Sequence, residues 1–454
     1  MPNELEQFYK SLTGKGALAL EPGDSRYVPL LEENDPIEAL CRRIKLAESE
    51  SVHLLTGFRG NGKSTQLKRL KKMLEDKAQC TVFLVDMLDY VLMTKPIDIA
   101  DFTLSLMAAL SFAVSPAKEE SARSGKPASF VEDYGKLAPW AKEFWEKFTN
   151  ALPTGIEADK LTLKLPAADL ALKLKTDQTF KKQIQEHFKG RPTRISDAAR
   201  QLVVNMVGEI RRQKGSDRKV VLLVDSLEQL RGMGEEAQRL YDSVRELFFG
   251  QAHNLSFSML HIVYTVPPYL PVLAPNIGLT LGGNPITGWP NIHVRDQQGE
   301  ADKNGLEIMK DIVEKRFAAW TNFMSPELMH KFAGCSGGDI REFFRLLREA
   351  AISLMSAREK NKEAVLDEPM AERVIQLLKN ELLPIAEKDA QWLVKIHESK
   401  KESLLDKQSL PDLARFFDSN LIMNYLNGKP WYDVHPLLVE EIETITKKTS
   451  DIKD

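Results

Sequence analysis

The residues whose types and spacing point most clearly to chemistry lie between positions 57 and 65. Residues 57–64 read GFRGNGKS and match the pattern G-x-x-x-x-G-K-[ST] at every position. Glycines in such a loop let successive backbone N–H groups face phosphate oxygens at the start of a helix. The lysine reaches the β- and γ-phosphates, and the hydroxyl after it is a ligand of Mg²⁺. The pattern therefore predicts binding of a nucleoside triphosphate together with Mg²⁺.

Each position of this loop has an expected role. Lys63 is expected to contact the phosphates, Ser64 to bind Mg²⁺ and Thr65 to meet the α-phosphate. The expected ligands are ATP, with ADP after hydrolysis, and Mg²⁺. The predicted nucleotide-binding residues of the loop are Gly57, Gly60, Asn61, Gly62, Lys63, Ser64 and Thr65.

The segments on either side of the loop have the patterns that would position it. Residues 52–56 (VHLLT) form a short run of strand-forming residues, and residues 63–74 carry apolar side chains at helical spacing. A strand, a glycine loop and a helix in this order are what phosphate binding requires. A helix from 36 to 48 precedes them, and a second strand is expected at 81–86.

A second acidic position follows a strongly apolar run. Residues 220–225 read VVLLVD, which predicts a central strand buried on both faces and ending in an acid. In open α/β sheets, ligands bind at the carboxyl ends of the strands. Buried strands often end in aspartate, but together with the loop upstream this position predicts that Asp225 is the Walker B residue, which holds Mg²⁺ through water.

The position of the acid that would activate water is open. Many hydrolysing relatives place a glutamate directly after the Walker B aspartate, where this chain has Ser226. The next acid, Glu228, could polarise the attacking water or cap the following turn. A fourth strand at 258–265 ends in Thr265, whose hydroxyl could touch the γ-phosphate or belong to a simple turn. A fifth strand is predicted at 291–294.

The chain resembles the AAA+ ATPases, particularly the bacterial branch near STAND and origin-recognition-type proteins. Four segments stand in the expected order: GFRGNGKST, VVLLVDSLE, HIVYTVP and GCSGGDIREFFRLL. The resemblance implies an α/β fold with a parallel five-stranded sheet, a helical lid and a C-terminal winged-helix domain. It gives the sensor 1 role to Thr265 and the sensor 2 role to Arg341, on a lid helix capped by Asp339. It also places Val28 against the adenine.

The resemblance covers roughly residues 25–350 without the insertion and departs from the family pattern at Ser226. No arginine finger is obvious: Arg316 is one candidate, and a solvent-facing helix arginine is the favoured alternative. The predicted organisation is an N-terminal arm and helix (1–50), an ATPase core (51–298) with a mostly helical insertion at 96–194, a lid (299–380) and a winged-helix-like domain (381–454). Within the insertion, 160–165 alternates like a strand, and 173–189 reads as a basic helix with a solvated face.

The C-terminal segment predicts helices at 384–398 and 410–417 followed by a hairpin. Asn427-Gly428 is a strong hairpin signal between two apolar runs. Winged-helix domains with this order bind DNA or pack on the ATPase, and the mixed local charge favours protein or intramolecular packing.

Composition limits the setting and the partners. The 454 residues have a net charge of −3, which gives no whole-chain argument for nucleic-acid binding. Three widely spaced cysteines and an acidic, polar N-terminus favour a cytoplasmic protein without a signal peptide. The longest apolar run, 102–114, is too short to cross a bilayer and reads as a buried helix, so no membrane partner is expected.

The sequence therefore favours an ATP-binding and ATP-hydrolysing switch that couples nucleotide state to a protein or DNA partner, or to self-association. The family resemblance adds bacterial defence or mobile-element regulation as the setting. Two alternatives stay open. Ser226 allows a nucleotide-gated adaptor that does not hydrolyse ATP, and the C-terminal domain allows a DNA-binding ATPase of replication or transposition type.

Overall fold

A computed structural model describes residues 4–14, 18–30, 35–115, 139–150, 175–188, 193–232, 234–401, 409–427 and 429–453. The chain divides into two compact units. The first, here the loop unit, comprises Met1–Pro36, Gly57–Gln66 and Gly288–Asp454. The second, the sheet unit, comprises Ile37–Thr56 and Leu67–Thr287.

The sheet unit is built around a five-stranded sheet with the strand order β2-β3-β4-β1-β5. The pairs β2–β3, β3–β4 and β4–β1 are all parallel. Every residue of β3 and β4 is buried, as expected for strands covered on both faces. The predicted α/β fold with a five-stranded sheet is confirmed. The strands are β1 (Ser51–Thr56), β2 (Thr81–Asp86), β3 (Val220–Asp225), β4 (Leu260–Val266) and β5 (Thr287–Gly288).

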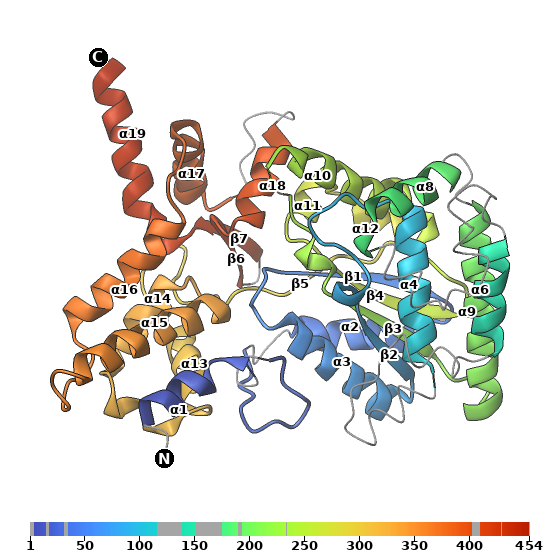
Figure 1. Ribbon diagram of the computed structural model, residues 1–454, viewed down its shortest axis with the longest axis horizontal. Coiled ribbons are helices and arrows are strands. Elements are labelled where there is room, and N and C mark those ends of the chain that lie inside the picture. Colours follow the sequence, from blue (N-terminus) through green and yellow to red (C-terminus); the bar gives the residue numbers. More distant parts are fainter. Residues whose placement is uncertain are drawn as a thin grey trace. The chain divides into compact units, whose positions relative to one another are not determined.

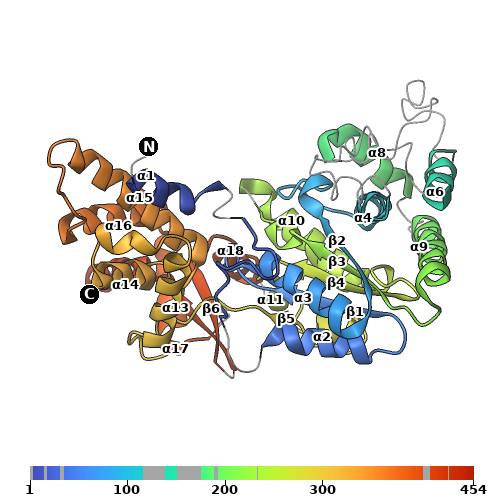
Figure 2. The ribbon, with the colours of Figure 1, turned by 90° about the horizontal axis from the view of Figure 1, so that it is seen from below.

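Helices lie on both faces of this sheet. α2 (Pro36–Leu46) and α3 (Lys63–Ala78) lie on one face and α10 (Ala237–Arg245) on the other (Figures 1 and 2). Shorter elements complete the connections. These are η2 (Met87–Asp89), η4 (Leu227–Gln229), η5 (Gly234–Glu236), η6 (Glu246–Gly250), η7 (Ala252–Asn254), α11 (Leu270–Leu273) and α12 (Ile277–Thr280).

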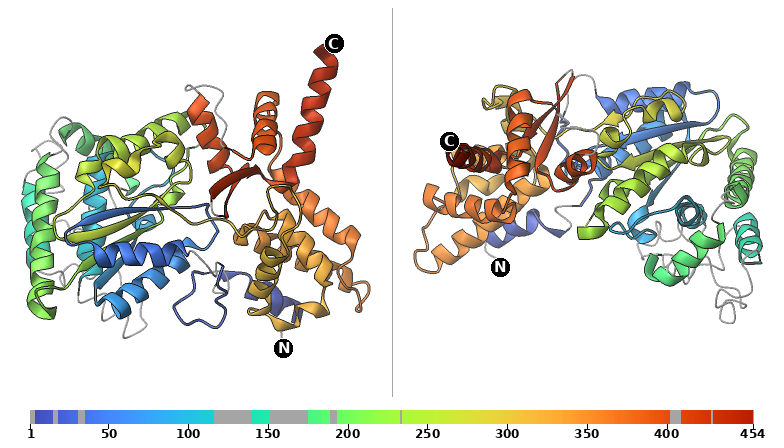
Figure 3. Two further views of the ribbon diagram at one scale, coloured as in Figure 1. Left: turned by 180° about the vertical axis from the view of Figure 1, so that it is seen from behind. Right: turned by 90° about the horizontal axis from the view of Figure 1, so that it is seen from above.

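The predicted insertion contributes helices α4 (Ile99–Ala113), α6 (Pro139–Asn150), α8 (Gln178–Phe188) and α9 (Thr193–Lys214). α9 lies beside both α4 and α6 (Figure 3). The apolar run at 102–114 lies in α4 up to Ala113 and is buried up to Ser111, which confirms the prediction of a buried helix. The solvated face predicted for the basic helix is wrong at Lys181, which is buried in an ion pair with Asp101 at 2.8 Å. The predicted strand at 160–165 lies outside the described residues.

The fifth strand is not where the sequence predicted it. β5 is the two-residue strand Thr287–Gly288, and residues 291–294 form no strand. Pro290 has no N–H group to give to a sheet. The N–H groups of Asn291 and Ile292 donate instead to Asn424 and Gly338, at 3.1 and 3.2 Å. β4 also begins two residues later than predicted, after Met259 with its positive φ of 66°.

The loop unit is mostly helical. One hydrophobic core that contains Phe8, Trp320 and Phe343 joins α1 to the helices predicted as a lid. Figure 2 shows these helices together. They are α1 (Glu4–Ser11) and the predicted lid helices α13 (Lys303–Glu314), α14 (Pro326–Cys335), α15 (Ile340–Arg358) and α16 (Glu368–Glu381), with η8 (Ala318–Asn322). The C-terminal part holds α17 (Glu387–Ser399), α18 (Leu410–Asp418), β6 (Ile422–Asn427), β7 (Lys429–Val434), η10 (Pro436–Leu438) and α19 (Val439–Lys453).

The predicted C-terminal helices and hairpin are present. β6 and β7 pair antiparallel, with Asn427 opposite Lys429, while the turn residue Gly428 lies outside the described residues. Figure 3 shows the hairpin among the C-terminal helices. The winged-helix assignment of this segment stays a prediction. In the parts of the chain that the structure describes, no helix combines the length and apolar character needed to cross a membrane.

Candidate functional site: a glycine loop, a lid turn and a strand-end acid

The glycine loop has a backbone conformation that residues other than glycine rarely adopt. Gly60 and Gly62 have φ angles of 98° and 89°, in the region that favours glycine. The loop follows β1 directly in the chain, and α3 begins at Lys63. A strand, a glycine loop and a helix therefore occur here in the order that the sequence predicted, which is the arrangement of a P-loop in an α/β fold.

Lys63 lies inside the loop. Its side chain is 3% exposed, and its ammonium donates to the carbonyls of Gly57 at 2.8 Å and Phe58 at 2.5 Å, and to Asn61 Oδ1 at 3.3 Å. A buried ammonium needs such partners because unpaired burial of a charge is costly. The loop carbonyls and the Asn61 side chain therefore hold the ammonium inside the loop.

Asn61 joins the loop to a residue that the sequence did not single out. Its side-chain amide donates to the carbonyl of Trp289 at 2.8 Å, and the indole N–H of Trp289 donates to the carbonyl of Asn61 at 2.9 Å. Both residues are buried. The only local signal at position 289 was a large aromatic residue before a proline, which does not indicate this role.

The turn before lid helix α15 lies against the same loop. Gly337 and Gly338 have positive φ angles, and Asp339 caps the helix by accepting from Glu342 N at 2.9 Å, as predicted. A Cβ added at Gly60 would lie 2.7 Å from Cβ of Arg341 and 2.8 Å from Oδ1 of Asp339. The structure thus brings Arg341 to the glycine loop, with an exposed side chain.

Asp339 is a buried acid near two cations. Burial raises the pKa of its carboxyl, whereas the backbone N–H donors at Glu342 and Arg341 and the charges of Arg341 and Lys63 act in the opposite direction. The charge of Lys63 is thus among the influences on Asp339, as expected where the lid turn lies against the loop.

The N-terminal arm also meets the loop. Thr65 Oγ1 accepts from Leu20 N at 3.0 Å, so the hydroxyl expected at the α-phosphate has a backbone partner in this structure. Val28 is 8% exposed and belongs to the hydrophobic core of the lid helices, together with Ile292 and Val294. Its predicted contact with adenine remains a prediction.

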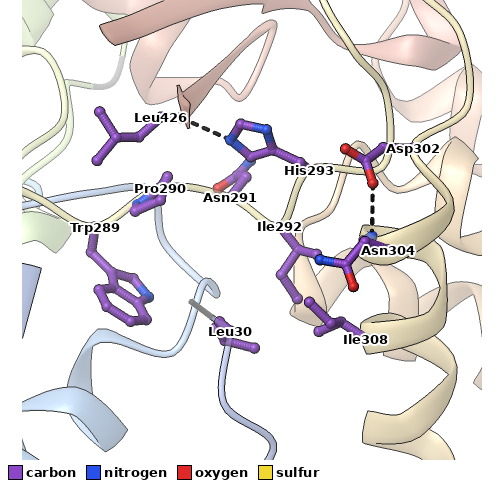
Figure 4. A pocket seen from close by; sticks show the side chains of 11 residues that line it. Leu30, Trp289, Pro290, Asn291, Ile292, His293, Asp302, Asn304, Ile308 and Leu426 are labelled. Carbon is purple, nitrogen blue, oxygen red and sulfur yellow. Dashed lines mark hydrogen bonds between the residues drawn. The ribbon is translucent and has the colours of Figure 1, made fainter. Parts of the chain in front are cut away.

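A small pocket of about 200 Å³ lies next to this arm and the loop-bound tryptophan. Apolar parts of its wall come from Leu30, Trp289, Ile292 and Ile308, which face one opening in Figure 4. Burial lowers the pKa of His293 at the rim, and its Nε2 accepts from Leu426 N at 3.0 Å. The pocket is smaller than the ~300–1,000 Å³ of sites for drug-sized ligands.

In the sheet unit, polar residues gather at the carboxyl ends of parallel strands. Asp225 ends β3 and pairs in register with Asp86 of β2, and Val224 lies opposite Tyr264, the residue before Thr265. The Thr265 hydroxyl is fully buried and accepts from Leu227 N at 3.0 Å. The structure therefore links Thr265 to the turn that follows Asp225.

Ser226 gives that turn its shape. It has a φ of 73°, in the left-handed region, and its N–H donates to Asp225 Oδ1 at 2.8 Å. The chain then enters η4, which carries Glu228 in a buried position at 9% exposure. The departure from the family pattern at Ser226 is thus also a sharp turn of the backbone, after which the next acid is Glu228.

Arg316 is not the solvent-facing arginine favoured from the sequence. It follows α13, donates to Ile312 O at 2.8 Å and lies 5.0 Å from the centre of the Phe344 ring. Burial lowers the pKa of its guanidinium to about 10. Packing against Phe344 of the predicted lid accounts for its position in this chain, and its arginine-finger role stays a prediction.

No protein-family model matches the chain, and no curated protein sequence matches it at a significant level. Distant similarity exists to solved structures. An ORC structure from Drosophila, determined with bound DNA, aligns with a TM-score of 0.39 and 10% identity, over 98% of this chain and 91% of that chain. The ORC2 protein of Aeropyrum pernix, in complexes with ADPNP and ADP, aligns at 0.37 and 11% identity, over 94% and 97%. A Walker-type ATPase of Pyrococcus abyssi aligns at 0.37 and 13% identity, over 94% and 99%.

Proposed function

We propose that this chain is an AAA+-type ATPase, a switch that binds Mg²⁺-ATP at the glycine loop and hydrolyses it. The observation that carries the proposal is the loop itself: Lys63 is buried among loop carbonyls, and Asp339 and Arg341, at the start of α15, lie against Gly60. A cation at the centre of a glycine loop and a second one on an adjoining turn suit a polyphosphate.

The residues present fit a triphosphate and its metal ion. A Cβ at Gly62 would meet no atom within 4 Å, so the space beside this part of the loop is open. Backbone N–H groups at the start of α3 add the positive end of a helix dipole. Ser64 of the loop offers a hydroxyl oxygen of the kind that Mg²⁺ prefers, and bound Mg²⁺ would supply charge neutralisation at the phosphates. The sequence pattern proposes Asp225, at the end of β3, as the residue that holds Mg²⁺ through water.

Each residue then has a role in the proposed switch. Lys63 exchanges its loop carbonyls for phosphate oxygens, and Arg341 reports on the γ-phosphate from the lid. The pocket beside Trp289 and Leu30 is the candidate site for the base, because Trp289, which binds the loop, is one of its walls. Thr265 fixes the turn after Asp225, and Glu228 on that turn polarises the attacking water.

The lid turn also offers a route from the nucleotide to the C-terminal segment. Tyr425 on the hairpin donates to Gly337 O at 2.8 Å, and Asn291 N donates to Asn424 O at 3.1 Å. A movement of Arg341 and the turn before it would therefore be transmitted to β6 through these hydrogen bonds. We propose that this segment, as a winged-helix-like domain, presents the nucleotide state to a protein or DNA partner.

The experiment that tests the enzymatic part is steady-state ATP hydrolysis by the full chain with and without Mg²⁺. Turnover that requires Mg²⁺ and falls about 100-fold or more in both Asp225→Asn and Glu228→Gln is the expected result. If the protein binds ATP but does not hydrolyse it, the alternative of a nucleotide-gated adaptor is favoured. The same assay with duplex DNA over a range of salt tests the DNA partner, since phosphate contacts give a steep salt dependence.

A further inference from the structure

We infer that Trp289 is a positioning residue of the phosphate loop: its indole N–H holds Asn61, and through Asn61 it fixes the loop in the shape that receives phosphates. The inference rests on the proposed function and assigns a role to a residue outside the sequence motif.

The contact is reciprocal, and both residues are buried. Trp289 is 2% exposed and Asn61 1%, and the two exchange hydrogen bonds of 2.8 and 2.9 Å, one through the side chain of each. Buried hydrogen bonds of this kind are costly to leave unmade, so they define geometry more than exposed ones do. The carbonyl of Trp289 also lies so close to Gly57 that a Cβ there would be 2.4 Å from it.

These bonds also determine which way the Asn61 amide faces. Because the carbonyl of Trp289 can only accept, it selects the NH₂ end of the amide and leaves Oδ1 directed to Lys63 Nζ, 3.3 Å away. Trp289 therefore influences the position of the lysine ammonium through one intermediate side chain.

The segment that carries Trp289 is itself anchored on the lid side. Ile292 N donates to Gly338 O at 3.2 Å, and a Cβ on Gly338 would lie 1.8 Å from Ile292 O. Asn291 N donates to Asn424 O in β6. Because these bonds anchor the segment, Trp289 supports the loop in a fixed position and does not adapt to it.

Two roles of Trp289 can be separated by the choice of ligand. As a wall of the base pocket it would affect only ligands that carry a base, whereas as a support of the loop it affects every ligand with phosphates. Inorganic tripolyphosphate with Mg²⁺ has the phosphates and no base. Trp289→Phe keeps an aromatic ring and the backbone carbonyl and removes the N–H donor.

The test is calorimetric titration of wild type and Trp289→Phe with Mg²⁺-ATP and with Mg²⁺-tripolyphosphate. We expect the variant to lose about two- to tenfold in affinity for both ligands, by a similar factor, as the loss of one buried hydrogen bond implies. Loss of affinity for ATP alone, or no loss for either ligand, overturns the inference. A wild type that binds neither ligand would instead refute the proposed function.

The chain offers a matched control for the loss of an indole. Trp320 is equally buried, at 2%, lies in the same unit, and has no hydrogen-bond partner for its Nε1 among the described residues. Trp320→Phe should leave both affinities unchanged. If Trp289→Phe does not fold, Asn61→Ala removes the other bond of the pair, from the Asn61 amide to the Trp289 carbonyl, and unchanged tripolyphosphate affinity in that variant contradicts the inference.

Discussion

Asn61 and Trp289 bind each other through two hydrogen bonds across 228 residues of sequence, and each contributes one side chain and one carbonyl. Asn61 occupies a variable position of the loop pattern, where the chemistry of phosphate binding sets no residue type. In this chain the position is used to attach the loop to the segment that leads into the lid. The conformation of the glycine loop therefore rests in part on a residue that lies outside the motif.

The approach of the lid turn to the loop predicts different costs for two glycines. Alanine at a positive φ costs about 1–2 kcal/mol at either Gly60 or Gly62. Only at Gly60 would the new Cβ also meet Arg341 and Asp339. Urea unfolding should therefore show Gly60→Ala less stable than Gly62→Ala by about 1–3 kcal/mol. Equal losses in the two variants would contradict the close approach.

The backbone at Ser226 predicts an unusual response to substitution. A φ of 73° is unfavourable for serine, and more so for a β-branched residue, whereas glycine adopts it readily. Ser226→Gly should be more stable than Ser226→Val by about 1–2 kcal/mol in free energy of unfolding. A valine variant as stable as the glycine variant would show that the turn after Asp225 is not left-handed.

The bond from Leu227 N to Thr265 predicts which hydroxyl substitutions preserve hydrolysis. Thr265→Ser retains the acceptor, whereas Thr265→Val removes it and leaves a buried N–H without a partner. Turnover should fall by about tenfold or more in Thr265→Val and stay near the wild-type value in Thr265→Ser. Wild-type turnover in the valine variant would show that hydrolysis does not depend on the hydrogen bond between Leu227 N and Thr265.

Two buried histidines, His53 near the start of β1 and His261 near the start of β4, predict that the protein loses stability in acid. Ser51 Oγ lies 2.8 Å from His261 Nδ1 and 3.0 Å from His53 Nε2, and burial lowers the pKa of both histidines to about 4. An unfolded histidine has a pKa of about 6.5, so between pH 6.5 and 4 the unfolded chain binds more protons. Their contribution to stability is therefore complete above pH 6.5 and is lost as the pH falls toward 4.

The size of this effect can be measured directly. Each histidine should remove about 2 kcal/mol from the free energy of unfolding between pH 7 and pH 5. Urea midpoints at the two pH values should differ less in His53→Gln than in wild type. The exposed His253 serves as the control, because its replacement by glutamine should leave the difference unchanged. A wild-type midpoint that does not change with pH would contradict the burial of the pair.

Much of the fold could be predicted because it rests on local patterns. The apolar run before Asp225 is β3 over the predicted residues, and helical spacing after the glycine loop is α3. The hairpin and its flanking helices follow from equally local signals. The fifth strand failed at 291–294 because its N–H groups have partners in the lid turn and in β6, and such distant contacts leave no local pattern.

The candidate site divides in the same way. The glycine loop and the cap at Asp339 are local motifs, and their conformations follow from residue type. The role of Trp289 could not be predicted, since it depends on which segment lies against the loop after folding. Similarly, the sequence favoured a solvent-facing Arg316, whereas the residue is half-buried beside Phe344.

The central claim is that Lys63 binds the phosphates of ATP, and calorimetric titration of the full chain with Mg²⁺-ATP tests it most directly. Wild type should bind one ATP per chain, and Lys63→Ala should bind it about 10- to 100-fold more weakly, through loss of charge-assisted hydrogen bonds. Lys72, on the same helix in a surface ion pair with Asp76 at 3.0 Å, provides the control, and Lys72→Ala should bind as wild type does. Equal affinity of Lys63→Ala and wild type for ATP would contradict the assignment of the glycine loop as the nucleotide site.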